Sequence, residues 1–110
     1  MTEENLIQRI DAGNIVFKRS FAKLKPDILK EARQAIGQLL LVDVNNPSAR
    51  LHLHPLTSKI VPSVLDPSRR VKVYTFHLTS NDTWKASFTL ENGTAFLRLC
   101  GPHDRIDDNP

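Results

Sequence analysis

The chain has 110 residues, the size of one small domain and too few for separate cofactor and substrate domains. Apolar residues make up 40% and charged residues 25%, as in ordinary globular proteins, and no stretch approaches the roughly 20 apolar residues of a membrane span. The single cysteine, Cys100, excludes an internal disulfide and predicts a reducing cytoplasm. A net charge of +3 favours phosphate or an acidic partner, although a mildly basic surface is also common in proteins that bind neither.

The first half of the chain predicts an N-terminal extension, a strand and two helices. Residues 1–13 are polar and are predicted to be the extension. The segment NIVFKRSF, residues 14–21, predicts a strand that runs into a helix, with Ser20 as a cap. A main helix follows from Pro26 and ends at NNPS, residues 45–48. One stripe of this helix is predicted to be buried, because apolar residues repeat at i, i+4: Ile28, Ala32, Ile36 and Leu40.

The segment LHLHPL, residues 51–56, contains two of the four histidines. If it is a strand, His52 and His54 project to the same side, and a metal site completed by His77 or His103 is one interpretation. No carboxylate or cysteine lies at a recognised ligand spacing, so proton transfer is the favoured interpretation for His54, whose backbone is pinned by the following Pro-Leu pair. From Leu56 to Arg70, two prolines and the lack of a steady period predict a loop.

Three strands are predicted in quick succession in the second half. They are VKVYTFHL (71–78), TWKASFTL (83–90) and AFLRLC (95–100), and Asn92-Gly93 between the last two is a strong hairpin signal. With those two residues as the loop, the pairs are Phe88 with Leu97, Ala86 with Leu99, Ser87 with Arg98, and Lys85 with Cys100.

The first hairpin has to place its apolar residues on the same face as those of the second. A three-residue loop from Ser80 to Asp82 achieves this, and it sets Leu78 opposite Trp84 and His77 opposite Lys85. The sheet then has an apolar face for the helices and a polar face that carries His77, Lys85 and Arg98. The alternative is that this second face is merely solvated, as is common in antiparallel sheets.

Histidines and cations converge on this polar face. Imidazole groups can act as acid or base near neutral pH, and a neighbouring cation can hold a phosphate oxygen. The set therefore predicts metal-free phosphodiester cleavage. The alternative is that each histidine is a hydrogen-bonded structural residue. The members of the set are His54, His77, His103, Lys85 and Arg98.

Five segments together resemble the RelE/ParE superfamily of bacterial toxins. They are FKRSFAKLKPD near the start, HPLTSK after the helix, the pair VYTFHL and TWKASF, and the ending LCGPHDRI. They span Asn14 to Ile106, the domain implied by the resemblance, with residues 107–110 as an acidic tail. The chain is most similar to the YafQ-like messenger-RNA endonucleases. It departs from them where Ile106 and Asp107 stand in place of an aromatic residue, and in a longer loop after Thr57.

The resemblance implies an α+β fold, with helices on one face of a small, mostly antiparallel twisted sheet. It implies catalytic roles for His54, His77, Lys85 and His103, and RNA-binding or orienting roles for Asp82, Arg98 and Asp104, with no metal or cofactor. His54 is expected to be the base and His103 the acid, or the reverse, with Lys85 offsetting the charge of the phosphorane. Trp84 is expected in the core, and His52 is left structural.

The implied function is that of the toxin in a toxin–antitoxin pair. Such a toxin cuts messenger RNA on the ribosome by attack of a ribose 2′-hydroxyl on the adjacent phosphate. A cognate antitoxin is expected to form a hetero-oligomer with it and to cover the basic surface with an acidic segment. The alternatives are a ParE-like toxin that inhibits DNA gyrase without catalysis, and a degenerate member that only binds its antitoxin.

Overall fold

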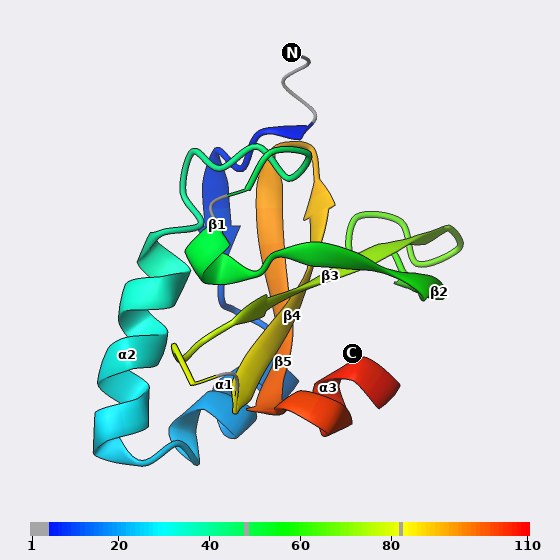
Figure 1. The fold of residues 1–110 in the computed structure, drawn as a ribbon. Helices are drawn as coiled ribbons and strands as arrows, with labels where there is room; N and C mark the ends of the chain where they lie inside the picture. The colour runs from blue at the N-terminus through cyan, green and yellow to red at the C-terminus, as the bar shows by residue number, and fades with distance from the viewer. Residues whose placement is uncertain (1–4, 48, 82) are drawn as a thin grey trace.

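The computed structural model describes residues 5–47, 49–81 and 83–110, so Asp82 lies outside the described residues. A mixed five-stranded sheet has the order β1-β5-β4-β3-β2, in which β1 is parallel to β5 and the other neighbours are antiparallel (Figure 1). The predicted α+β class is confirmed. The strands are β1 (Arg9–Asp11), β2 (His54–Pro62), β3 (Arg70–His77), β4 (Trp84–Glu91) and β5 (Thr94–Pro102). The helices are α1 (Ile15–Ala22), α2 (Pro26–Gly37), the short 3-10 helix η2 (Ala49–Leu51) and α3 (His103–Asp108).

Helices α1 and α2 cover the apolar face of the sheet. Phe17 of α1 and Ala32 and Ala35 of α2 belong to one buried cluster with Phe88 and Leu97 of the sheet. Helix α3 starts directly after β5, at the lower end of the sheet in Figure 1, and its residue Asp107 contacts Lys85 on the polar face. The expectation that the helices share one face therefore holds for α1 and α2 but not for α3. No helix in the described ranges is long and apolar enough to cross a membrane.

The strand predicted over residues 14–21 is wrong, because α1 occupies this segment. The side chain of Asn14 accepts hydrogen bonds from the backbone N–H groups of Val16 and Phe17 and thereby caps the helix. Ser20 lies inside the helix, and its hydroxyl donates to the carbonyl of Phe17. The first strand is instead β1, within the segment predicted as an extension, and Ile7 just before it is fully buried in the core.

Helix α2 ends at Gly37, well before the predicted stop at residues 45–48. Ala32 is buried and Ile28 and Ile36 pack against the core, as the stripe predicts, but Leu40 lies beyond the helix end and is exposed. Glycine is a poor helix former, and the N–H of Gln38 closes the last turn on the carbonyls of the preceding residues.

The loop predicted from Leu56 to Arg70 is also wrong over its first half. Strand β2 occupies His54–Pro62 at the edge of the sheet, paired with β3 and irregular between Pro55 and Ile60. Proline is tolerated in an edge strand, where its missing N–H need not find a partner. His52 does not belong to this strand, because its φ of 47° turns the chain after η2.

The predicted register of the β3–β4 hairpin is confirmed, with His77 opposite Lys85. In the β4–β5 hairpin, Glu91 faces Thr94 and Phe88 faces Leu97 as predicted, with Asn92 and Gly93 both at positive φ in the turn. Beyond the pair of Phe88 and Leu97, the predicted register is wrong by one residue. An irregularity next to Phe88 leaves Arg98 without a register partner, so Ser87 faces Leu99, Ala86 faces Cys100 and Lys85 faces Gly101.

Glu91 at the end of β4 fixes the loop that follows β2. Its carboxylate accepts hydrogen bonds from the hydroxyl groups of Ser63 and Thr89 and from the backbone N–H groups of Val64 and Leu65. Partial burial acts to raise the pKa of Glu91, but these hydrogen bonds outweigh it and hold the pKa below 4.5.

We expect Glu91→Gln to lower the free energy of unfolding by about 1–2 kcal/mol at pH 7, because charge-assisted hydrogen bonds become neutral ones. A carboxylate with a depressed pKa in the folded state stabilises above its unfolded pKa, and this contribution disappears as the pH falls through the folded value. Urea unfolding of both proteins from pH 7 to pH 3 measures the difference. A difference that stays constant below pH 4 contradicts the assignment.

Candidate functional site

Three histidines form a cluster at one end of the sheet. The rings of His52 and His77 stack with centroids 4.4 Å apart, and the ring of His103 meets that of His77 edge-on at 5.9 Å. We call His52, His77 and His103 the histidine cluster. His77 ends β3, and His103 begins α3, where its backbone N–H donates to the carbonyl of Thr83 at 2.9 Å. His52 reaches the cluster because the turn after η2 folds it back over the end of β3.

Lys85 and Asp107 lie beside the histidine cluster. The Lys85 Nζ atom is 3.0 Å from Oδ1 and 3.3 Å from Oδ2 of Asp107, and the lysine side chain is only 2% exposed. A buried ammonium group requires such a partner, because desolvation of an unpaired charge is costly. The other oxygen of the same carboxylate, Oδ2, is 3.4 Å from Nδ1 of His103. Asp107 therefore links the buried cation to a histidine of the cluster.

His54 lies on the same face, next to the histidine cluster but outside it. In the register, His54 faces Thr75, and Thr75 and His77 project to the same side of β3. The His54 side chain is exposed, and its Nδ1 is 3.2 Å from the carbonyl oxygen of Pro55. Thr75 is fully buried, and its hydroxyl has no hydrogen-bond partner among the described residues.

The polar face is not simply solvated. Thr75, Ser87 and Thr89 are completely buried on it. The C-terminal segment lies over part of this face, because Asp107 contacts Lys85, and Nε of Arg98 donates to the carbonyl oxygen of Pro110 at 3.4 Å. Of residues 107–110, predicted as an acidic tail, Asp107 and Pro110 thus contact the sheet, while Asp108 and Asn109 are exposed.

The three predicted orienting residues differ in their placement. Arg98 sits at the irregular position in β5, towards Glu91; burial lowers the pKa of its guanidinium, while the charge of Glu91 acts to raise it. Asp104 is fully exposed, with Oδ1 3.3 Å from Nδ1 of His103. Asp82 lies outside the described residues.

Sequence reasoning missed two members of the site, Asp107 and His52. The acidic composition of residues 107–110 predicts a tail, although Asp107 lies four residues after His103, the spacing that places two side chains on one helix face. That spacing could have identified it once residues 103–108 were assigned to a helix. The sequence predicts a structural role for His52, because only the turn at its positive φ brings it onto His77.

The arrangement offers imidazole groups for proton transfer and an ammonium group for holding an anion. Among the described residues, no group of three or more histidine, cysteine, aspartate or glutamate side chains is placed to hold a metal ion. Burial raises the pKa of the Cys100 thiol, although a hydrogen bond with Ser20 opposes this, so Cys100 is unsuited to act as a nucleophile.

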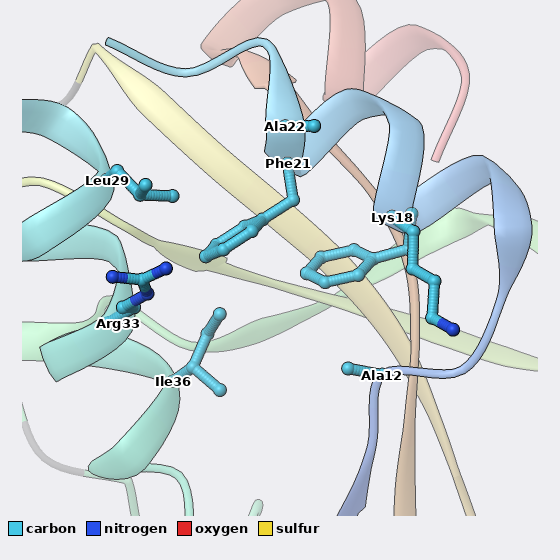
Figure 2. A pocket seen from close by; sticks show the side chains of 8 residues that line it. Ala12, Lys18, Phe21, Ala22, Leu29, Arg33 and Ile36 are labelled. Atoms are coloured by element: carbon cyan, nitrogen blue, oxygen red, sulfur yellow. The ribbon is translucent and has the colours of Figure 1, made fainter. Parts of the chain in front are cut away.

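A separate pocket of about 470 Å³ lies between α1 and α2, away from the histidine cluster. Figure 2 shows Phe21 of α1 pointing towards Ile36 and Arg33 of α2, with Lys18 on the opposite side of the pocket. The predicted site residues do not line it.

Comparisons with known proteins found no protein similar to this chain. No family model matches its sequence, and the search of curated proteins found no match. The search of solved structures found no match either. The chemistry of the site therefore rests on the chain's own residues and their geometry.

Proposed function

We propose that the protein is a metal-independent endoribonuclease that acts as the toxin of a toxin–antitoxin pair. One observation carries the enzymatic part: His77, Lys85 and His103, singled out from the sequence, meet on one face of the sheet. His52 and Asp107 complete the arrangement. A set of proton-transfer groups around a buried cation suits cleavage of a phosphodiester better than it suits a passive surface.

The proposed reaction needs a base, an acid and a cation. A base removes the proton of a ribose 2′-hydroxyl, and the 2′-oxygen attacks the adjacent phosphorus. The bond from phosphorus to the 5′-oxygen breaks, and an acid protonates that oxygen, leaving a 2′,3′-cyclic phosphate. We assign His54 as the base and His103 as the acid, with the exchange of roles as the alternative.

The remaining residues orient these groups. The Lys85 ammonium offsets the charge that develops on the phosphorane. Asp107 holds the ring of His103 by its contact with Nδ1, which directs Nε2 away from the carboxylate. His77 faces Lys85 in the register and stacks on His52, so it contacts the histidine cluster on one side and neighbours the cation on the other.

The resemblance to the RelE/ParE superfamily supports the biological part of the proposal. An α+β fold with a mostly antiparallel sheet is compatible with it. On this proposal the protein acts in the cytoplasm on messenger RNA at the ribosome, and a cognate antitoxin neutralises it.

A second candidate is a degenerate member that binds its antitoxin without cleaving RNA. The contact between Asp107 and Lys85 favours it, because a carboxylate already occupies the ammonium group that would hold the phosphate. Catalysis requires the RNA phosphate to share or displace this contact.

The test of the proposed function is 5′-end mapping of cellular transcripts after a short induced pulse of the protein. We expect new ends inside translated regions with the wild type, and none with the His54→Ala/His103→Ala double variant. Lys30→Ala on the exposed side of α2 serves as a control that keeps the cleavage pattern. Growth arrest without new ends would exclude the nuclease and leave a bound target such as gyrase. Absence of both effects would favour the degenerate member.

A further inference from the structure

A second cavity opens on the other side of the sheet end that carries the histidine cluster. It has a volume of about 460 Å³ and lies between α1, the end of β5 and the start of α3. Three cationic residues line it, namely Arg19 and Lys23 of α1 and Arg105 of α3, and all three are exposed. None of the described residues that line it is an aspartate or glutamate. We call this cavity the basic groove.

Trp84 supplies an aromatic wall to the basic groove. Its side chain packs against the hydrophobic core, as predicted, but it remains partly exposed where it lines the groove. Packing on one side holds the ring in place without closing the groove. The groove therefore combines a fixed aromatic ring with three positive charges.

The basic groove adjoins the histidine cluster through the backbone. Trp84 directly precedes Lys85 in β4, and successive residues of a strand project to opposite faces of a sheet. Trp84 faces Pro102 in the register, and Pro102 directly precedes His103. An RNA strand that leaves the groove over Pro102 would therefore meet His103, the next residue of the protein.

We infer that the basic groove binds a nucleotide of single-stranded RNA next to the bond that is cleaved. This inference rests on the proposed function, which places the cleaved bond at the histidine cluster. Proteins that bind single strands combine cations along the phosphate backbone with aromatic rings on which bases stack, and the groove offers both. Its volume lies within the range of small-ligand sites.

An acidic peptide is the competing occupant of this surface. The three cations would serve it equally well, but a peptide carboxylate gains nothing from the face of a tryptophan ring. Continuity with the histidine cluster also favours the polynucleotide, because Pro102 in the groove lining directly precedes His103.

Trp84 is the single tryptophan of the chain, so a change in tryptophan fluorescence on binding reports on the basic groove. We would titrate the full chain with a 2′-O-methyl oligouridine of about eight nucleotides, a length within the site sizes of single-strand binding proteins. Such an oligonucleotide cannot be cleaved by 2′-hydroxyl attack. Stacking of a base should quench the emission of Trp84, and the affinity should fall steeply as salt is raised.

Two charge-reversal variants with equal changes in net charge locate the binding. Arg19→Glu/Lys23→Glu/Arg105→Glu should weaken binding by about 10-fold or more, since three phosphate contacts are reversed. Lys18→Glu/Lys30→Glu/Arg33→Glu changes three exposed cations of α1 and α2 outside the groove, and it should weaken binding less than about threefold. Far-ultraviolet circular dichroism confirms that both variants fold.

Several outcomes overturn the inference. Binding by anisotropy without a change in tryptophan emission, or equal weakening by both triple variants, places the RNA elsewhere. Equal quenching by polyglutamate assigns the groove to an acidic peptide. Because the probe is uncleavable, quenching without cleavage of ordinary RNA refutes only the nuclease, whereas cleavage without quenching refutes only the groove.

Discussion

Replacing His103 with alanine lowers the rate of RNA cleavage by the purified protein by about 100-fold or more, the usual contribution of a positioned acid or base. The reason is geometric. His103 is the histidine that joins both parts of the site, because its ring meets His77 edge-on and its Nδ1 lies 3.4 Å from Asp107. Loss of the imidazole removes a proton-transfer group, while the backbone N–H that anchors residue 103 to Thr83 remains. We would follow cleavage of a short labelled RNA under single-turnover conditions.

Asp104→Ala separates the two carboxylates beside His103, and its expected small effect departs from the orienting role that the resemblance implies for Asp104. Asp104 is the neighbour of His103 and lies at a similar distance from its Nδ1, but its carboxylate is fully exposed to solvent. Screening by water makes such a contact weak, so the rate should fall less than about threefold. A His103→Ala variant that keeps a third of the wild-type rate, or an Asp104→Ala variant that loses as much as His103→Ala, is incompatible with the assigned role.

Asp107→Ala lowers the free energy of unfolding by about 2–3 kcal/mol, because it strands the ammonium group of Lys85 in a buried position. The side chain of Lys85 is 2% exposed, whereas that of Asp107 is 32% exposed. The loss is therefore smaller than for a fully buried pair. It is larger than the loss from Lys85→Met, which leaves a carboxylate that water can reach and costs about 1 kcal/mol.

The double variant Lys85→Met/Asp107→Ala separates charge pairing from packing. Removal of both charges leaves no stranded group, so its stability should return to within about 1 kcal/mol of the wild type. Its cleavage rate should nevertheless stay low, because the cation that stabilises the phosphorane is gone. Urea unfolding measures the stabilities. Two single losses that simply add in the double variant would falsify the coupling between Lys85 and Asp107.

Local sequence patterns predict the two C-terminal hairpins and place His77 opposite Lys85 in the site. Turn residues fix the start of each register, and the alternation of apolar and polar residues admits only one face for the core. For this reason Glu91 opposite Thr94 and His77 opposite Lys85 were predictable without a structure. The same local rules could not show the irregularity beside Phe88, which leaves Arg98 without a register partner in β4, since nothing in the alternation requires an extra residue there.

Contacts between segments that are distant in sequence depend on the folded chain and have no local sequence signal. The short strand β1 and the edge strand β2 gain their hydrogen bonds from β5 and β3, and neither has a strong local signal of its own. The turn at His52 and the helix that carries Asp107 acquire their roles by docking on β3 and β4. Pairing of a buried charge depends on which distant group can reach it, and this is a property of the folded chain that composition and periodicity do not contain.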